Sequence, residues 1–359
     1  MPRRTILPFG PQHPVLPEPI HLDLAVRDEK VVDVVPSLGF IHRGLELLVA
    51  KKDFMDMVFV AERICGMCSF IHGLGYCQGV EEIMNLPVTP RAKYLRVFWS
   101  ELSRVHSHIL WLGLAADAFG FESLFMHSWK IRERILDIFE ESTGGRIIFG
   151  VCKVGGLRKD IPDDVLKRFK NTLDEIETEF KVLAKVFEDD YSVKHRNCGV
   201  GVLTADDAYK LGAVGPMLRA SGVSQDLRKL GYAAYGDLNF EPVVEKDGDC
   251  YARTMVRVRE VYQSFDLMRQ CLAKMPEGPV DIKVTGFPKG EFFSRLEQPR
   301  GEVVYYMKGD GTKNLQRYRV RTPTFSNVPP LIKVLGGCDL ADVPVIVLTI
   351  DPCISCTER

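Results

Sequence analysis

The sequence predicts a predominantly helical α+β protein, with a core of long helices and small antiparallel β elements near both termini. Between about residues 44 and 275, apolar residues recur at steps of three and four, as on one face of a helix. Alternating apolar and polar residues, typical of strands, occur only toward the two ends of the chain. The chain has 359 residues, of which 46% are hydrophobic, and no linker or internal repeat divides it. We therefore expect a single domain over residues 1–359.

The N-terminal region is expected to contain a β-hairpin over about residues 18–36. Apolar residues alternate from Ile20 to Val26, the sequence RDEK provides a turn, and Val31–Val35 form the returning strand. The proline-rich residues before this hairpin are expected to form a loop. From Gly44, the sequence GLELLVAKKDFMDMVFVAERI changes to helical periodicity and predicts a helix.

The helical core continues with four long amphipathic segments. Their expected bounds are Pro90–Ala118, about Glu122–Glu141, about Pro162–Asp190 and Tyr251–Met275. Proline is favoured in the first turn of a helix, so it marks two of these starts. Thr204 is expected to cap a further, short helix in the sequence TADDAYKLG.

The C-terminal region, about residues 280–359, is expected to consist of strands and loops. The sequence VVYYMKGDGTKNLQRYRVRTP predicts a hairpin that turns around Gly309–Gly311. The apolar run VPVIVLTI predicts a strand that leads directly into the sequence DPC.

Composition excludes several classes of protein. A net charge of −1 excludes a nucleic-acid partner, because binding to a phosphate backbone requires a clustered basic surplus. No stretch reaches the roughly 18–20 apolar residues of a membrane span, and the proline-rich N-terminus is unlike a secretory signal. Ten cysteines without such a signal indicate a reducing compartment. These features predict a soluble protein of the cytoplasm.

Four of the cysteines form two pairs of identical spacing. Cys65 and Cys68 lie in RICGMC, and Cys353 and Cys356 lie in DPCISC near the C-terminus. The pairs offer four sulfurs to one metal site if the fold brings the two ends of the chain together. Zinc sites usually draw both pairs from segments about 12–20 residues apart, whereas most of the chain lies between these pairs. From the spacing alone, a zinc ion and an iron–sulfur cluster both stay open.

The residues around the cysteines carry a resemblance to a known family. RICGMCSFIHG and DPCISCTER closely resemble the nickel-ligand motifs of the large subunit of [NiFe] hydrogenases. PFGPQHPVLPEPIHLDL, GFIHRGLELL, EQPRGEVVYYMKGDG and TPTF are similar to further sequence blocks of that family and occur in the same order. The resemblance therefore covers essentially the whole chain and implies the fold of the hydrogenase large subunit.

Within this family, the chain looks like the short, energy-converting, membrane-bound type of group 4, which is called Ech-like. It begins at the GPQHP block, without the additional N-terminal domain of the formate-hydrogenlyase large subunit, and this favours the Ech or CO-linked type. GPQHP and HRGLE are also similar to the quinone-site subunit of respiratory complex I. That relative lacks the four cysteines, so their presence favours a hydrogenase.

The resemblance implies that the four cysteines hold a nickel–iron centre. Cys65 and Cys353 would be terminal ligands of nickel, and Cys68 and Cys356 would bridge nickel to iron. In this family, the iron also carries CO and cyanide ligands. Thiolates suit such a site because soft sulfur tolerates changes in the oxidation state of nickel.

Other residues match positions that surround the metals in the family. Arg300 and Thr324, which follows Pro323, match donors to the two cyanide ligands. His72 matches a histidine that hydrogen-bonds a bridging thiolate, and Asp351 matches an aspartate next to the ligands. The resemblance gives these residues supporting roles in catalysis.

Two carboxylates match further functional positions. Glu18 in LPEPIHL aligns with the glutamate that relays protons to and from a terminal cysteine. Glu46 aligns with a carboxylate that binds magnesium in relatives whose last residue is a histidine. This chain has Arg359 at that position, so an Arg359–Glu46 ion pair is the expected alternative to magnesium.

The resemblance implies the catalytic subunit of a membrane-bound hydrogenase that interconverts H2 with protons and electrons. No iron–sulfur cluster is expected in this chain, because no further cysteines have cluster-binding spacing. Electrons would therefore pass to a small subunit with a [4Fe–4S] cluster, a ferredoxin-like subunit and soluble ferredoxin. Integral membrane subunits would translocate ions, which places the chain peripherally on the cytoplasmic side of the membrane. The alternative is a subunit of a complex I-like assembly that binds zinc or no metal.

Overall fold

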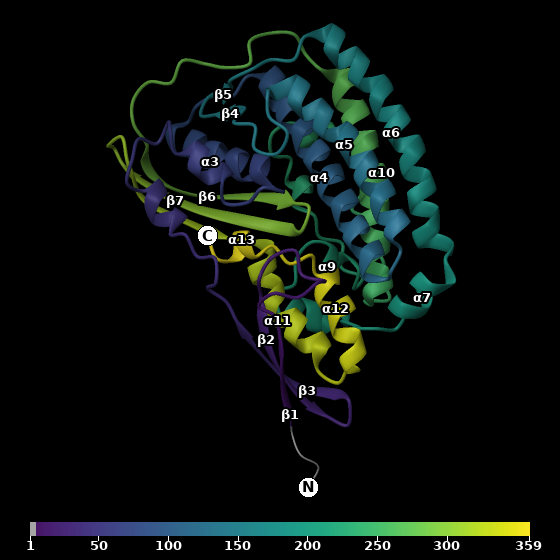
Figure 1. The fold of residues 1–359 in the computed structure, drawn as a ribbon. Helices are drawn as coiled ribbons and strands as arrows, with labels where there is room; N and C mark the ends of the chain where they lie inside the picture. The colour runs from purple at the N-terminus through teal and green to yellow at the C-terminus, as the bar shows by residue number, and fades with distance from the viewer. Residues whose placement is uncertain (1–4) are drawn as a thin grey trace.

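Four long helices form one layer of the computed structural model, which describes residues 5–359 (Figure 1). They are α4 (Pro90–Ala118), α5 (Glu122–Thr143), α6 (Asp163–Asp189) and α10 (Cys250–Lys274). Helix α4 packs against α5 and α10, and α6 packs against the same two helices. The four long helices predicted from periodicity are confirmed to within a few residues, and so is the predominantly helical α+β class.

The ends of these helices follow from local chemistry. Pro90 occupies the first turn of α4, where its missing N–H is not needed. Helix α5 ends at Gly144, whose φ of 92° lies in the left-handed region that glycine adopts without strain. The Asp249 carboxylate accepts a hydrogen bond from the Ala252 N–H at the start of α10.

The helix that follows the first cysteine pair, α3 (Ser69–Met84), lies on an antiparallel sheet of three strands. The strands are β6 (Lys289–Gln298), β7 (Gly301–Asp310) and β8 (Leu315–Arg321), in that order. Gly75 permits the close approach, because a Cβ atom there would lie 2.2 Å from the Tyr305 ring. The predicted hairpin is confirmed as β7–β8, whereas the periodicity did not reveal β6.

A second antiparallel sheet forms the tapered end of the molecule (Figure 1). It consists of β1 (Thr5–Phe9), β2 (His21–Arg27) and β3 (Lys30–Ser37), with β2 in the centre. The predicted hairpin is confirmed as β2–β3. The segment before it was expected to be a loop, but Thr5–Phe9 pair with β2; Pro8 is tolerated there because β1 is an edge strand. The first four residues of the expected loop lie outside the described part of the chain.

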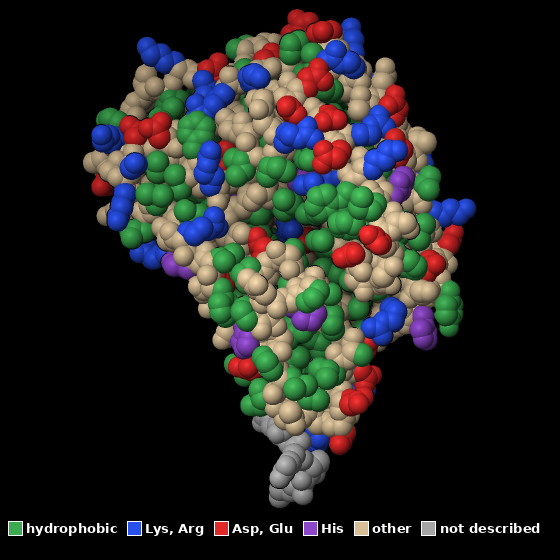
Figure 2. All heavy atoms as spheres, in the orientation of Figure 1, with side chains coloured by type: hydrophobic (Ala, Val, Ile, Leu, Met, Phe, Trp, Pro, Cys, Tyr) green, Lys and Arg blue, Asp and Glu red, His purple; other side chains and the backbone are tan. Residues whose placement is uncertain are grey.

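The tapered end also contains the C-terminal helices α11 (Pro323–Leu335) and α12 (Val343–Thr349). They bury one face of the β1–β3 sheet through contacts between Leu22, Leu331 and Ile346, among others. Large hydrophobic side chains also remain exposed on this sheet, and hydrophobic surface is visible over the tapered end in Figure 2. They include Ile6, Val32 and Val35.

Two predictions for the C-terminal region were wrong. VPVIVLTI forms the helix α12 and not a strand, because it is buried among α4, α10 and α11. A short apolar run that is buried on all sides has no periodicity to separate helix from strand. The region 280–359 also contains α11, whose two internal prolines, Pro329 and Pro330, conceal it from the sequence pattern.

The helix expected from Gly44 is divided into α1 (Leu45–Val49) and α2 (Val58–Glu62). Between them, the Phe54 N–H donates to the Lys313 carbonyl at 2.8 Å, in the turn between β7 and β8. The chain leaves the helical path there because its backbone pairs with this turn.

The remaining elements are short, and none of the helices among the described residues is long and apolar enough to cross a lipid bilayer. Thr204 caps α8 as predicted, because its side chain accepts a hydrogen bond from the Asp207 N–H. The remaining elements are β4 (Cys152–Lys153), β5 (Gly156–Leu157), α7 (Tyr191–Asn197), α8 (Ala205–Lys210), α9 (Pro216–Arg219), α13 (Ile354–Thr357) and the 3-10 helices η1 (Leu227–Leu230), η2 (Tyr235–Asp237) and η3 (Leu340–Asp342).

Candidate metal centre

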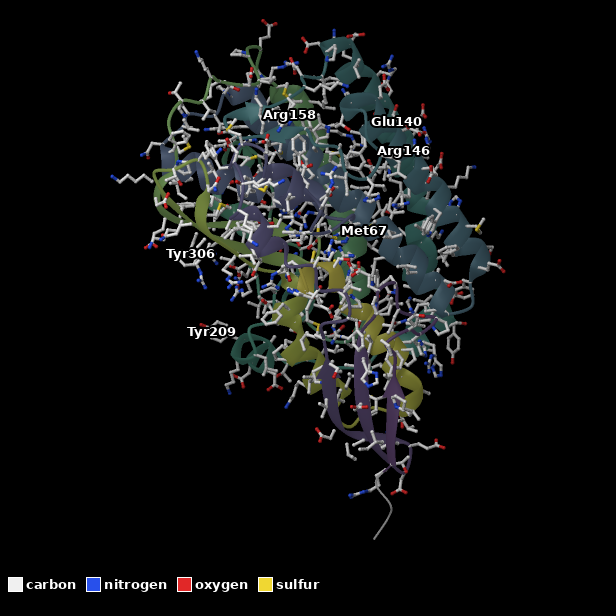
Figure 3. All side chains as sticks on the ribbon, turned by 60° about the vertical axis from the view of Figure 1, so that its left-hand side comes forward. Met67, Glu140, Arg146, Arg158, Tyr209 and Tyr306 are labelled. Atoms are coloured by element: carbon white, nitrogen blue, oxygen red, sulfur yellow. The ribbon has the colours of Figure 1, made fainter. Side chains whose placement is uncertain are left out.

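The fold brings together the two cysteine pairs, which lie far apart in the sequence. Cys65 and Cys68 lie between α2 and α3, and Cys353 and Cys356 lie at α13, beside the β6–β8 sheet (Figure 1). Met67, between the first two cysteines, lies near the centre of the molecule beside the C-terminal segment (Figure 3). All four cysteines are buried.

The sulfur atoms are close enough to share metal ions. The Sγ atoms of Cys65 and Cys353 lie 3.3 Å apart, and those of Cys68 and Cys356 lie 3.4 Å apart. The sulfurs of Cys65, Cys68 and Cys356 all lie within 4.8 Å of one another. Thiolates bound to one ion at about 2.3 Å would be separated by roughly 3.3–3.8 Å. Cys65, Cys68 and Cys356 therefore fit a shared metal centre, and Cys353 lies beside it through its contact with Cys65.

The environment of the closely packed thiols shifts the pKa values of Cys68 and Cys356 in opposite directions. Burial opposes ionisation of Cys68, but hydrogen bonds from the other three thiols and the nearby His72 lower its pKa well below the usual value. Burial, together with the hydrogen bonds it donates, raises the pKa of Cys356. The protein thus lowers the pKa of one thiol of the cluster and raises that of its neighbour, and a bound cation would favour the thiolate form of both.

His72 lies where the resemblance predicted a partner for a bridging thiolate. Its Nε2 atom is 3.3 Å from the Cys356 sulfur, and its Nδ1 atom is 2.8 Å from the Tyr305 hydroxyl. The side-chain amide of Gln298 is 3.3 Å from the same Nε2 atom. Tyr305 and Gln298 were not predicted as site residues, although both lie in the block EQPRGEVVYYMKGDG and Gln298 comes two residues before Arg300.

Arg300 and Asp351 form a buried ion pair next to the second cysteine pair. The Arg300 guanidinium donates to the Asp351 carboxylate at 2.8 Å and to its backbone carbonyl at 2.9 Å. Asp351 has a φ of 55°, in the left-handed region, which aspartate tolerates better than most residues. Thr324, after Pro323 at the start of α11, accepts a hydrogen bond from the Cys353 N–H at 3.1 Å.

Glu18 reaches the C-terminal cysteine loop from the segment before β2. Its carboxylate accepts hydrogen bonds from the Ser355 N–H at 2.9 Å, the Ile354 N–H and the Ser355 hydroxyl. Ile354 directly follows Cys353, so the carboxylate lies beside the loop of that cysteine.

The carboxylate of Glu46 is paired with positively charged side chains of the protein itself. It pairs with Arg359 at 2.9 Å, as expected, and also with Arg319. Burial opposes ionisation, but the Val320 N–H and the two guanidinium groups together lower the pKa of this carboxyl. Two guanidinium groups repel a divalent cation, so these residues do not fit a magnesium ion.

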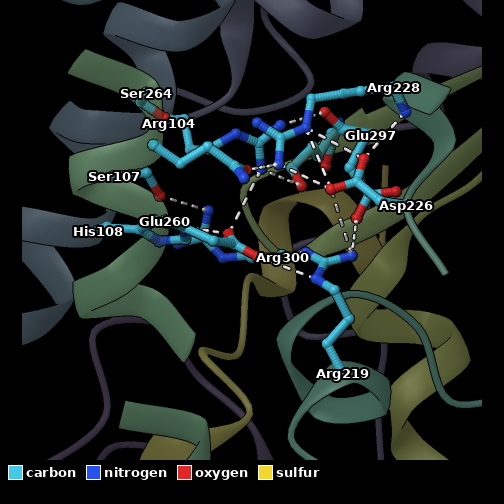
Figure 4. Close-up of polar contacts among 12 residues, drawn as sticks. Arg104, Ser107, His108, Arg219, Asp226, Arg228, Glu260, Ser264, Glu297 and Arg300 are labelled. Carbon is cyan, nitrogen blue, oxygen red and sulfur yellow. Dashed lines mark hydrogen bonds and ion pairs between the residues drawn. The ribbon is translucent and has the colours of Figure 1, made fainter. Parts of the chain in front are cut away.

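A network of buried ion pairs lies between the end of β6 and the layer of long helices (Figure 4). It consists of Glu101, Arg104, His108, Arg219, Asp226, Arg228, Glu260 and Glu297, all fully or almost fully buried. Arg104 donates to the backbone carbonyls of Glu297 at 2.9 Å and Gln298 at 3.2 Å. The network therefore holds the end of β6, from which Gln298 contacts His72. Sequence periodicity gave no sign of it, because its members come from five separate segments.

The buried carboxyl group of Glu62, one turn before Cys65, predicts a pH-dependent stability. Burial raises its pKa to about 7, although Arg63 and Arg158 oppose this effect. The folded state therefore binds this proton more tightly than the unfolded state, and its contribution to stability is lost as pH rises to 7. We expect Glu62→Gln to gain up to about 3 kcal/mol relative to the wild type between pH 5 and pH 8.

Urea unfolding of both proteins at the two pH values measures this difference. The exposed Glu82→Gln on α3 serves as the control and should show no such change. Equal pH dependence of the Glu62→Gln variant and the wild type would contradict the prediction.

Comparison with known proteins places the chain in a family. Residues 43–115 match the model of the nickel-dependent hydrogenases. Residues 118–286 and 282–359 match that of the 49-kDa subunit of respiratory-chain NADH dehydrogenase. The first match contains Cys65 and Cys68, and the second contains Cys353 and Cys356.

Individual relatives align over nearly the whole chain. It is 39% identical to a carbon monoxide-induced hydrogenase of Rhodospirillum rubrum, over 98% of this chain and 99% of the relative. It is 36% identical to the alpha subunit of a membrane-bound hydrogenase of Pyrococcus furiosus, over 98% and 87% of the two chains. It is also 35% identical to one of the subunits of the F(420)H(2) dehydrogenase of Methanosarcina mazei, over 99% and 97%. The chain therefore belongs to the family that unites the large subunits of nickel-dependent, membrane-bound hydrogenases with the 49-kDa subunit of respiratory-chain NADH dehydrogenase.

Proposed function

We propose that this protein is the catalytic subunit of an energy-converting [NiFe] hydrogenase, which interconverts H2 with two protons and two electrons. The observation that carries this proposal is the convergence of four buried cysteine sulfurs from the two ends of the chain. Cys65 and Cys353 would hold nickel, and Cys68 and Cys356 would bridge it to an iron with CO and cyanide ligands. When bound, this centre supplies the site at which H2 is cleaved or formed.

The chain's own residues hold and tune the thiolates. His72 donates a hydrogen bond to the Cys356 sulfur in the tautomer that carries its proton on Nε2, and Tyr305 then donates to Nδ1. Arg300 places a permanent positive charge beside the site, since a guanidinium does not lose its proton. Because these side chains are buried, water does not screen their charges.

Glu18 is assigned the proton relay between Cys353 and solvent, and its replacement gives a prediction. Glu18→Gln retains a carbonyl oxygen for the Ile354 and Ser355 N–H groups but has no carboxyl group to carry a proton. We expect H2 turnover to fall about 10²-fold while nickel content stays that of the wild type. Isotope exchange between H2 and D2O and elemental analysis measure the two effects.

Ser355→Ala provides the control for Glu18, because it removes a hydrogen bond to the same carboxylate without removing the carboxylate. This variant should retain proton exchange. Equal loss of exchange and nickel in Glu18→Gln would instead indicate a structural glutamate.

The electron and ion partners are proposed from the resemblance of the sequence to the energy-converting hydrogenases. Electrons would leave through a small subunit with a [4Fe–4S] cluster and a ferredoxin-like subunit, with soluble ferredoxin as the redox partner. The Pyrococcus relative is named as part of a membrane-bound hydrogenase. We therefore assign this chain to a complex with ion-translocating membrane subunits, on the cytoplasmic side.

Metal analysis of the purified complex tests the proposed function. Near-stoichiometric nickel, together with infrared bands of iron-bound CO and cyanide, would support it. Zinc or no metal, without those bands, would overturn it.

The second candidate is a subunit of a complex I-like assembly that is not a hydrogenase. It is favoured by the match of residues 118–286 and 282–359 to the 49-kDa subunit of NADH dehydrogenase. The same measurement decides between the two, because this candidate predicts a complex without nickel.

A further inference from the structure

One surface arginine connects both cysteine loops. Arg43, in the loop before α1, donates from one terminal nitrogen (Nη2) to the Ile64 carbonyl at 2.7 Å and to the Ser355 carbonyl at 3.1 Å. Its other terminal nitrogen donates to the Arg63 carbonyl at 2.9 Å. A single guanidinium therefore binds backbone from both ends of the chain.

The two shared carbonyls are directly joined to metal-site cysteines. The Ile64 carbonyl belongs to the peptide bond that leads into Cys65, and the Ser355 carbonyl belongs to the peptide bond that leads into Cys356. Their common donor therefore restricts the distance between the two cysteine loops. A planar guanidinium suits this contact because its donors point in fixed directions, unlike those of a lysine ammonium.

The loop that carries Arg43 has its own anchor. The Glu358 carboxylate accepts hydrogen bonds from the Gly39 and Ile41 N–H groups, both at 2.6 Å. The His42 ring contacts the Glu358 carbonyl at 2.6 Å. The loop is therefore held at the C-terminus without the Arg43 side chain, which is exposed. Substitution of Arg43 should leave both the loop and the core in place.

We propose that Arg43 is a positioning residue that fixes the separation of the two Cys-x-x-Cys loops and so retains the metals. The proposal rests on the proposed function for the identity of the metals. The arginine touches neither a sulfur nor a reacting atom, and it acts through the backbone on both sides of the centre.

The purified complex of the wild type and three variants tests the proposal. Arg43→Gln removes the charged fork, Arg43→Lys retains the charge without the fork, and Arg63→Gln is the matched control. Arg63 is also an exposed arginine near Cys65, but its side chain donates to the Phe59 carbonyl of its own helix. Nickel per protein is measured before and during incubation with EDTA, together with the infrared bands of iron-bound CO and cyanide.

We expect Arg43→Gln to lose nickel about tenfold faster than the wild type, because its loops are no longer joined by charge-assisted hydrogen bonds. Its infrared bands should broaden or shift, Arg43→Lys should be intermediate, and Arg63→Gln should match the wild type. The proposal would be overturned if Arg43→Gln lost nickel at a rate within twofold of the wild type and its infrared bands were unchanged. An equal effect of Arg63→Gln would also overturn it. If Arg43→Gln does not assemble, Arg43→Lys is judged by the same criteria.

Amide hydrogen exchange separates this proposal from the proposed function. If the wild-type complex contains no nickel, the proposed function fails, but the positions of the loops can still be compared. Faster exchange in Arg43→Gln over both residues 64–68 and residues 353–357 would then support the positioning role, and unchanged exchange would overturn it.

Discussion

Replacement of Cys353 by serine is expected to abolish H2 turnover while the subunits still assemble. The Cys353 sulfur lies 3.3 Å from that of Cys65, so serine would replace one of the four thiolates at the centre. A hydroxyl is a harder and less acidic donor than a thiol and binds nickel weakly as a neutral group. The substitution is nearly isosteric, so the cost to folding should be only about 1 kcal/mol.

Hydrogen evolution from a reduced dye and nickel content, both measured on the purified complex, test this expectation. The matched control is Cys271→Ser, because Cys271 is also fully buried but lies in a separate apolar cluster with Val97 and Leu267. This control should retain nickel and activity. A Cys353→Ser complex with full activity would remove Cys353 from the metal centre and contradict the assigned role.

The sequence predicted the parts of the fold that depend on local pattern. The long helices α4, α5, α6 and α10 were predicted because each has a sustained apolar period, and proline marks the start of two of them. The errors occurred where tertiary contacts decide the structure. The helix α12 has no polar face, and the segment between α1 and α2 is diverted by the contact of Phe54 with Lys313.

In the candidate site too, local sequence patterns could be read from the sequence, whereas tertiary contacts could not. The four cysteines and Glu18, His72, Arg300 and Asp351 were predicted as site residues because each lies in a short sequence block that resembles a family motif. The contacts of Tyr305 with His72 and of Arg43 with Ser355 join residues far apart in the chain. No spacing rule reveals such contacts, since they arise only when the sheet and both cysteine loops are assembled.

The largest expected effect on stability comes from the buried ion network. Arg219 is fully buried and pairs with Glu260 at 2.6 Å and with Glu297 at 2.7 Å. Replacement by leucine would leave two carboxylates buried without this cation. We expect Arg219→Leu to lower the free energy of unfolding by about 3–5 kcal/mol, as for other broken buried ion pairs. Urea denaturation followed by circular dichroism measures the change.

Arg146→Leu is the control that shows whether the loss of stability depends on the burial of the ion pairs or on their number. Arg146 pairs with three acidic residues, including Glu140 beside it at the surface (Figure 3). Water already solvates these charges, so the loss of all three pairs should hardly change the unfolding midpoint. Equal destabilisation by the two substitutions would show that the network owes nothing to its burial. A much larger effect of Arg219→Leu would show that the desolvated charges of the network stabilise the fold, including the end of β6, whose Gln298 carbonyl accepts a hydrogen bond from Arg104.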